Sequence, residues 1–415
     1  MNDTIISQYK TRLEEYQPIV GKNIIDELKI LGSHLAGRKV HNINSTFSGG
    51  GVAEILARMV PLLQQLGIDA TWDVIQGDDA FFNVTKKFHN ALHGKDESVS
   101  KDDLDIFMET SRKNNGSMAL NSDIYYIHDP QPIMLIERKK SLGGKWIWRC
   151  HIDVSHPDKE VWKFLRKYVV QYDATVFSSP EFSQQLPVRQ YMISPSIDPL
   201  SDKNREIAPS VIQSVLDKFG LVNGKPMVVQ ISRFDYLKDP LGVIQAFRMV
   251  RKGIDCQLVL AGGTADDDPE SSRVLEEVRE CAGNDPDIKI LAIPPGSDLE
   301  INALQRAATV VFQKSLKEGF GLTISEALWK SKPVVATAVG GIPLQVINKV
   351  TGLLCHSVDG AAYALKQLLS NPDYATWLGK NGHEHVKQNF LITRHVKEYL
   401  LLFIVVDNPS DTIFL

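Results

Sequence analysis

The second half of the chain alternates short apolar runs with stretches whose apolar residues recur at helical spacing. The runs rich in β-branched residues are residues 226–232, 257–263, 288–293, 309–315 and 333–339. Helical spacing covers residues 239–252, a stretch that ends near Cys281, and residues 298–308. Continuous apolar strands separated by helices are typical of a parallel sheet that is buried on both faces. The pattern therefore predicts a doubly wound, Rossmann-like domain of the α/β class.

The first half of the chain repeats this pattern less regularly. An apolar run over residues 39–46 ends in a glycine-rich turn at residues 47–51. A helix with one apolar face follows this turn, and the face is formed by Ile55, Leu56, Met59, Val60, Leu63 and Leu66. Four further runs, ATWDVIQ, DIYYIHD, WIWRCHID and ATVFSS, each have a helical segment nearby. A second α/β domain is the simplest account of this half.

A stretch without any apolar period separates the two halves. Residues 193–204 are rich in Pro, Ser and Asp, which is typical of a linker. We therefore expect one domain over residues 1–200 and another over residues 201–382. Two such domains would leave a deep cleft between the carboxyl ends of their strands, where open α/β sheets bind ligands.

Composition narrows the class of protein further. The 415 residues are 43% hydrophobic and 23% charged, and the formal net charge of -4 argues against a constitutive nucleic-acid binder. No apolar run approaches the ~18 residues of a membrane span, and the first ten residues lack the apolar core of a signal peptide. The four cysteines are scattered without CxxC spacing, so we expect thiols in a reducing compartment, the cytoplasm.

The glycine-rich turn of the first half is one candidate binding site. Ser48, Gly49, Gly50 and Gly51 lie between a predicted strand and a helix, where backbone N–H groups can approach an anion. The spacing is not GxGxxG, and the following strand does not end in an acidic residue that could bind the ribose of a dinucleotide. These two features argue against a dehydrogenase, and a tight turn without a ligand is the alternative.

A second candidate follows the first strand of the second domain. Arg233 and Lys238 lie between this strand and the next helix, at the edge that would face the cleft. A guanidinium and an ammonium group can together neutralise a diphosphate leaving group. The alternative is a pair of solvated surface charges.

The third candidate is the stretch SLKEGFGLTISE over residues 315–326. A strand ends before Leu316, and a helix is expected from Leu322, so N–H groups at residues 320–323 would face a phosphate or sugar oxygen. Glu326 could accept both hydroxyls of a ribose, while Glu318 reaches another part of the same ligand. A general acid and base pair of a hydrolase is the weaker alternative, because such a pair must straddle the scissile bond.

Together these motifs resemble those of the retaining GT-B glycosyltransferases, the superfamily of glycogen and sucrose-phosphate synthases. More narrowly, HNINSTFSGGGVAEIL, FFNVTKKFHNALHG, HDPQP, RCHID and SIDPLSDKN look like blocks of the trehalose glycosyltransferring synthase family. The resemblance implies a GT-B fold whose C-terminal helix, within residues 383–415, packs back on the N-terminal domain. It also implies a retaining transfer of glucose from a nucleoside diphosphate glucose to glucose, giving α,α-trehalose.

The resemblance also implies a role for each matching residue. Arg233, Lys238, Glu318 and His151 would be catalytic. Donor contacts would come from Arg233, Lys238, Glu318 and Glu326 and from the backbone of Gly50, Gly51, Gly319, Phe320, Gly321 and Leu322. Acceptor contacts would come from Asp153, Phe82, Asn83, Lys86, His89 and Asn90. The alternative for the block from Phe82 to Asn90 is a polar loop.

Three further features could belong to a functional site or could have only a structural role. The sequence His128-Asp129-Pro130 is either part of the site or a strand-end turn, and His41 is interpreted as a strand residue with a partner. Asp266, Asp267 and Asp268 could hold a metal, but carboxylates at a helix start are also favoured by the helix dipole, and we prefer capping.

The expected reaction is a front-face transfer, because no motif residue clearly supplies a carboxylate nucleophile. We expect no tightly bound cofactor and no metal site, with Mg²⁺ aiding only in solution, so that activity survives a chelator. The expected partners are sugar and nucleotide-sugar substrates, without nucleic acid or membrane.

Several alternatives remain open from the sequence alone. They are a trehalose phosphorylase that uses phosphate as acceptor, a transferase with another small acceptor, and a non-catalytic sugar-nucleotide-binding protein. The nucleotide base, the direction of flux and a homodimeric state are also left open.

Overall fold

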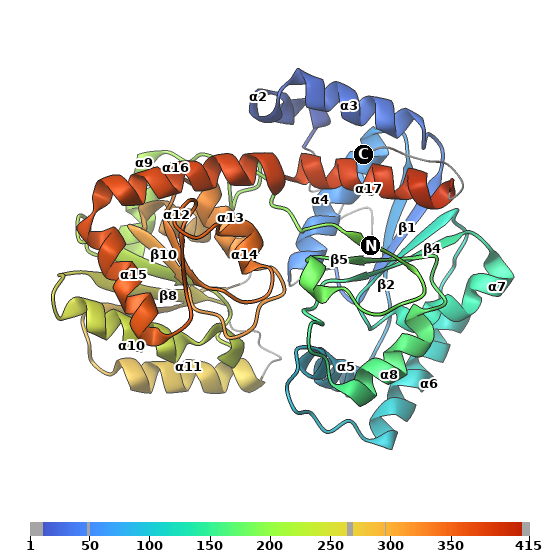
Figure 1. Ribbon diagram of the computed structural model, residues 1–415, viewed down its shortest axis with the longest axis horizontal. Coiled ribbons are helices and arrows are strands. Elements are labelled where there is room, and N and C mark those ends of the chain that lie inside the picture. Colours follow the sequence, from blue (N-terminus) through green and yellow to red (C-terminus); the bar gives the residue numbers. More distant parts are fainter. Residues whose placement is uncertain (1–10, 48–49, 264–268, 295, 409–415) are drawn as a thin grey trace. The chain divides into compact units, whose positions relative to one another are not determined.

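The chain divides into two compact units, and each contains one six-stranded parallel sheet (Figure 1). Unit 1 consists of residues 1–196 and 392–415, and unit 2 consists of residues 197–391. The structure is a computed structural model that describes residues 11–408 apart from 48–49, 264–268 and 295. The predicted α/β class with two doubly wound sheets is thus confirmed, and the division between the units falls inside the predicted linker.

The sheet of unit 1 has the strand order β2-β1-β3-β4-β5-β6, with all neighbours parallel. Its strands are β1 (Lys39–Asn44), β2 (Asp69–Val74), β3 (Ile124–His128), β4 (Lys145–Cys150), β5 (Ala174–Phe177) and β6 (Arg189–Met192). The order reverses between β1 and β3. In an open parallel sheet, ligands bind beyond the carboxyl ends of the strands at such a switch point.

Helices cover both faces of this sheet (Figure 1). They are η1 (Leu13–Tyr16), α2 (Gln17–Val20), α3 (Lys22–Ser33), α4 (Gly51–Gln65), α5 (Asp79–Leu92), α6 (Lys101–Ser117), η2 (Ile133–Arg138), α7 (Lys139–Leu142), α8 (Lys159–Val169), η3 (Pro180–Phe182) and α17 (Ile392–Asp407). The predicted apolar face of α4 is buried, as are every residue of β1 after Lys39 and every residue of β3.

The sheet of unit 2 has the order β12-β11-β10-β7-β8-β9, and it is also parallel throughout. Its strands are β7 (Met227–Ile231), β8 (Gln257–Gly262), β9 (Ile288–Ala292), β10 (Val310–Gln313), β11 (Val334–Thr337) and β12 (Leu353–Cys355). Here the order reverses between β7 and β10, which pair through Val228 with Val310 and Val229 with Val311. The ends of these two strands therefore frame the switch point of unit 2.

The helices of unit 2 begin where polar side chains can cap them. Asp239, Ser357 and Asn371 each accept a backbone N–H group in the first turn of α10, α15 and α16. The helices are α9 (Pro209–Lys218), η4 (Tyr236–Lys238), α10 (Pro240–Arg251), α11 (Pro269–Ala282), α12 (Asp298–Ala307), α13 (Leu322–Trp329), α14 (Ile342–Gln345), α15 (Val358–Ser370) and α16 (Pro372–Asn389).

The C-terminal segment differs from the expected single unit over residues 383–415. It contains the end of α16, which belongs to unit 2, and α17, which belongs to unit 1 and packs against α3 and α4. The helix breaks at Phe390, whose φ of -132° is not helical and whose carbonyl accepts the N–H of Ile197 at 2.9 Å.

The state of the cysteines and the length of the apolar helices were both predicted from the sequence. All four cysteines are free, and Cys281 is half-buried where the other three are buried. Within the described parts of residues 11–408, no helix is both long and apolar enough to cross a membrane.

Candidate active site

The predicted cationic turn and the predicted glutamate turn lie side by side in unit 2. The first turn follows β7 and carries Arg233 and Lys238, while the second follows β10 and carries Glu318. Because β7 and β10 are adjacent, the two turns meet at the switch point, and the N–H of Leu316 donates to the Leu237 carbonyl at 2.7 Å. The strand order thus brings together residues that are 80 positions apart.

Lys238 and Glu318 form an ion pair at this junction. The Nζ atom of Lys238 lies 2.6 Å from Oε2 of Glu318, and the hydroxyl of Ser315 donates to the same oxygen at 3.1 Å. The two side chains are only 18% and 10% exposed, so the pair is largely shielded from water. Arg233 is 57% exposed, and its guanidinium lies 3.7 Å from the Asp235 carboxylate. One cation is therefore held by a carboxylate, and the other remains accessible to an anionic ligand.

A second ion pair, between Lys314 and Asp239, joins the same two turns. Asp239 has a left-handed φ of 47° and also caps α10 by accepting the N–H of Gly242 at 3.1 Å. Sequence reasoning missed this pair. An aspartate before Pro240 is a recognisable helix start, but nothing in the sequence identifies Lys314 as its partner.

The glycine turn after Glu318 packs closely against a second pair of glycines, Gly340 and Gly341. Gly321 adopts φ of 84° at the N-cap of α13, which suits glycine. A Cβ atom on Gly340 would lie 1.7 Å from the Glu318 carbonyl, and the N–H of Gly341 donates to the Gly319 carbonyl at 3.2 Å. Gly340 and Gly341 were not among the predicted site residues, although two adjacent glycines shortly after a strand are a signal of close backbone approach.

This arrangement leaves backbone donors without partners. In the described part of the chain, the N–H groups of residues 319–323 have no hydrogen-bond partner; the first three precede α13 and the other two lie in its first turn. Unpaired N–H groups at the start of a helix can bind a phosphate or hydroxyl oxygen. The geometry is thus suited to the oxygens of a phosphorylated sugar.

Glu326 lies one turn into α13 and is 1% exposed. Its Oε2 atom accepts a hydrogen bond from Gln305 at 3.0 Å, and its Oε1 atom lies 4.0 Å from the ammonium group of Lys203. The structure therefore separates the two glutamates: Glu318 pairs with Lys238, whereas Glu326 belongs to a buried polar group on the other side of the turn.

In unit 1, the predicted site residues also gather at the carboxyl ends of strands. Gly50 caps α4 with φ of 114° and Gly51 begins the helix, while Ser48 and Gly49 lie outside the described residues. His151 directly follows β4, and its Nε2 atom lies 3.1 Å from Nδ1 of His128 at the end of β3. From the sequence, His128 is either a site residue or part of a strand-end turn, and the structure places it against His151.

Asp129 fixes the backbone of His151. It adopts φ of 66°, and its Oδ1 atom accepts the His151 N–H at 2.7 Å. Burial raises the pKa of the Asp129 carboxyl to about 7, against the lowering effect of the His151 N–H and the Arg149 charge. The predicted acceptor residue Asp153 instead caps its own loop by accepting from both the N–H and the hydroxyl of Ser155.

The predicted acceptor block lies on a helix, α5, so the polar-loop alternative is wrong. Val84 and Phe88 face the core, whereas the side chains predicted to contact the acceptor are exposed or half-buried: Phe82, Asn83, Lys86, His89 and Asn90. Asn90 donates to Glu97 at 2.8 Å, and the rings of His89 and His93 are 4.6 Å apart. His41 is a buried strand residue whose Nε2 atom lies 2.8 Å from the Asp73 carboxylate, as expected.

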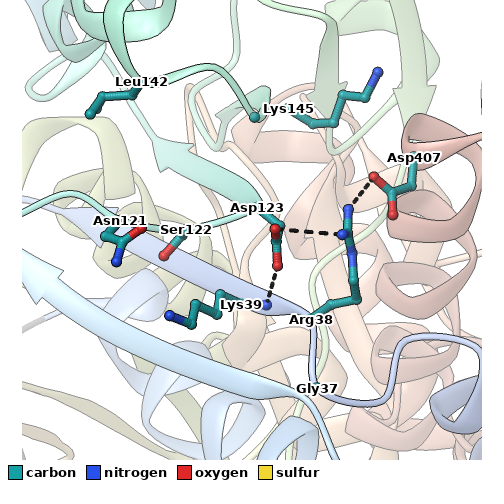
Figure 2. A pocket seen from close by; sticks show the side chains of 10 residues that line it. Gly37, Arg38, Lys39, Asn121, Ser122, Asp123, Leu142, Lys145 and Asp407 are labelled. Carbon is teal, nitrogen blue, oxygen red and sulfur yellow. Dashed lines mark hydrogen bonds and ion pairs between the residues drawn. The ribbon is translucent and has the colours of Figure 1, made fainter.

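A cavity of about 570 Å³ lies at the opposite, amino edge of the unit 1 sheet (Figure 2). Arg38 lies in it between Asp123 and Asp407, at 3.5 Å and 2.6 Å. The ammonium groups of Lys39 and Lys145 point away from each other, so they do not converge on one ligand. We assign this cluster to holding the end of α17, because Asp407 is its last residue.

The described residues contain no group of three or more His, Cys, Asp and Glu side chains placed to hold a metal ion. The acidic triplet from Asp266 to Asp268 lies outside the described residues.

Comparison with known proteins identifies the family. A family model described as the N-terminal domain of trehalose synthase matches residues 42–184, and another, described as glycosyl transferases group 1, matches residues 212–385. A trehalose synthase of Thermococcus litoralis is 44% identical over 395 residues, which cover 94% of this chain and 96% of that protein. The chain belongs to the trehalose synthase family of glycosyltransferases.

Other relatives mark the range of this family's neighbours. A trehalose synthase of Rubrobacter xylanophilus is 42% identical over 94% of this chain and 96% of its own length. A trehalose phosphorylase of Pleurotus pulmonarius is 28% identical over 85% of this chain and 55% of its own length. An α,α-trehalose-phosphate synthase structure from Burkholderia xenovorans has a TM-score of 0.73 at 12% identity, covering 89% of this chain and all of that one. Trehalose synthase family membership and this likeness together establish the GT-B fold.

Proposed function

We propose that this chain is a retaining glucosyltransferase that moves glucose from a nucleoside diphosphate glucose to glucose, forming α,α-trehalose. The observation that carries the proposal is the junction of the two turns in unit 2, where Lys238 is paired with Glu318 at 2.6 Å beside the accessible Arg233. Cations beside a carboxylate and unpaired N–H groups suit a ligand with both phosphate and hydroxyl groups.

In the proposed reaction, the bond between C1 of glucose and the diphosphate oxygen breaks as the acceptor hydroxyl bonds to C1 on the same face. The proton of this hydroxyl passes to the departing phosphate oxygen, and a nucleoside diphosphate leaves. Arg233 and Lys238 stabilise the charge that develops on the leaving group. Glu318 then accepts hydrogen bonds from glucose hydroxyls, and Glu326 from the ribose. Reaction in the cytoplasm without a resident metal is part of the same proposal.

Substitution of the two cations tests this assignment. We expect Arg233→Ala and Lys238→Ala each to lower kcat on the order of 10²-fold, because each removes charge stabilisation from the leaving diphosphate. Release of nucleoside diphosphate is the measurement, and the melting temperature reports folding. Lys252→Ala, which changes an exposed lysine at the C-cap of α10, is the control. Wild-type kcat in Arg233→Ala would show that the diphosphate role is wrong.

A retaining trehalose phosphorylase is the second candidate, and the likeness to the Pleurotus pulmonarius enzyme favours it. In that reaction the phosphate takes the glucosyl group from trehalose and gives glucose 1-phosphate and glucose. Production of glucose 1-phosphate from trehalose and phosphate, without transfer from any nucleotide-glucose, would select this candidate.

A further inference from the structure

A row of polar groups crosses four adjacent strands of unit 1 near their carboxyl ends. The Nδ2 atom of Asn42 on β1 donates to the Thr71 carbonyl on β2 at 3.3 Å. The Oδ1 atom of Asn42 lies 3.3 Å from Nε2 of His128 on β3. The row continues through Nδ1 of His128 to Nε2 of His151, after β4, at 3.1 Å. It therefore follows the sheet order β2-β1-β3-β4.

The first contact in the row sets the direction of every hydrogen bond after it. A backbone carbonyl can only accept, so the amide nitrogen of Asn42 faces Thr71 and its oxygen faces His128. His128 must then carry its proton on Nε2, which leaves a lone pair on Nδ1. His151 donates to this lone pair from Nε2, and its own Nδ1 is left as an acceptor.

Both imidazoles are neutral, which the row requires. Burial lowers the pKa of His128 to about 3 and that of His151 well below its usual value, and the positive charge of Arg149 acts in the same direction. The other titratable groups around the pair are Asp129, His395 and Tyr126, whose ring centroid lies 4.6 Å from that of His128. Each ring thus carries one proton, and one proton occupies the contact between the two rings, which are stacked at 5.5 Å.

The two histidines differ in accessibility. His128 is 1% exposed, whereas His151 is half-buried and its Nδ1 atom has no partner among the described residues. The backbone of His151 is also held in place, because its N–H donates to Oδ1 of Asp129 at 2.7 Å. The backbone position of His151 and the protonation of its ring nitrogens are therefore both determined by neighbouring residues.

We propose that Asn42 and His128 are positioning residues that hold His151 in its Nε2–H tautomer, so that Nδ1 accepts a hydrogen bond from a hydroxyl of the sugar substrate. This inference deepens the proposed function and depends on it for the contact with sugar. The tautomer itself is a property of the ligand-free protein. It can therefore be tested separately.

The test is a long-range ¹H–¹⁵N spectrum of the full chain without ligand, in which the His151 signals are identified by their loss in His151→Asn. We expect a protonated Nε2 and an unprotonated Nδ1 at neutral pH. A proton on Nδ1 of His151 would overturn the proposal, whatever the activity of the protein.

Variants of the row give the second measurement. Asn42→Leu and His128→Leu remove the acceptors, and we expect His151 to populate both tautomers and kcat to fall on the order of tenfold. His128→Asn keeps an amide oxygen near the position of Nδ1, so it should retain the tautomer and most of kcat. Thr71→Val, which leaves the carbonyl in place, is the control.

The two proposals fail in different ways. An unchanged His151 spectrum in both leucine variants would overturn the row, even with a working wild-type enzyme. A correct tautomer in a protein that transfers no sugar would overturn the proposed function alone.

Discussion

Lys330 is a buried cation next to the candidate site of unit 2. Its ammonium group donates to Asn204 Oδ1 at 2.9 Å and to the Glu326 carbonyl at 3.1 Å. Burial lowers its pKa from 10.5 to about 7, although the Glu326 carboxylate opposes the shift. Between pH 7 and 10.5 the unfolded chain therefore binds more protons than the folded one, and stability rises with pH.

This gives a prediction for Lys330→Met, which cannot titrate. Between pH 6 and pH 9, the unfolding free energy of the wild type should rise relative to that of the variant by roughly 3 kcal/mol. Denaturant unfolding of both proteins at the two pH values is the measurement. A difference that stays constant with pH would show that Lys330 keeps its ordinary pKa.

Asp129 changes the stability of the protein in the opposite direction as pH rises. Its folded pKa of about 7 lies above the unfolded value of 3.8, so the folded state binds more protons between these values and stability falls as pH rises. Asn tolerates the left-handed backbone and can still accept the His151 N–H. From pH 4.5 to 7, we expect the wild type to lose about 3 kcal/mol of unfolding free energy relative to Asp129→Asn, measured by thermal unfolding. Equal pH profiles would contradict the raised pKa.

The sequence predicted where the candidate site residues lie relative to the strands, but not how they pair. Arg233, Lys238 and Glu318 follow strands whose apolar runs are plain, so their place at a strand end could be read directly. The ion pairs Lys238–Glu318 and Asp239–Lys314 join two turns that are far apart in sequence, and only the strand order brings them together. The contact between His128 and His151 could not be predicted either, because it also depends on which strands are adjacent.

At the scale of elements, the turn before α13 depends on the glycine pair after β11. A methyl group on Gly340 would overlap the Glu318 carbonyl, and its φ of 53° disfavours other residues. We expect Gly340→Ala to destabilise the protein by about 1–3 kcal/mol and to weaken donor binding, because the turn must shift.

Gly253→Ala is the matched control, since a Cβ there meets nothing within 4 Å. Thermal unfolding and titration with nucleoside diphosphate are the measurements. Unchanged affinity in a folded Gly340→Ala variant would show that the turn does not carry donor binding.

Two strands that the sequence pattern did not predict are short. Strand β6 is four residues long with no buried residue, and β12 has three residues, so neither shows a continuous apolar run. Both are edge strands of their sheets. The break between α16 and α17 was missed because Val386, Phe390, His395 and Tyr399 keep helical spacing across it. A hydrogen bond from Ile197, nearly 200 positions away in the chain, ends α16 there.

At the scale of the whole molecule, the two sheets share a reversal of strand order that the sequence pattern does not predict. Each reverses its strand order once, and the predicted glycine, cationic and glutamate turns follow the strands at these reversals. Apolar periodicity predicted the parallel sheets, but periodicity does not contain the order of strands within a sheet. The family likeness over 94% of the chain is consistent with this shared plan.

The central claim is that glucose moves from a nucleoside diphosphate to glucose with retained configuration. The most direct measurement is an NMR spectrum of the product formed from glucose and ADP-, UDP- or GDP-glucose. We predict the single anomeric signal of the symmetric α,α-linked disaccharide with at least one donor, matched by equal release of nucleoside diphosphate. A β-linked product, or no disaccharide with any of the three donors, would contradict the account.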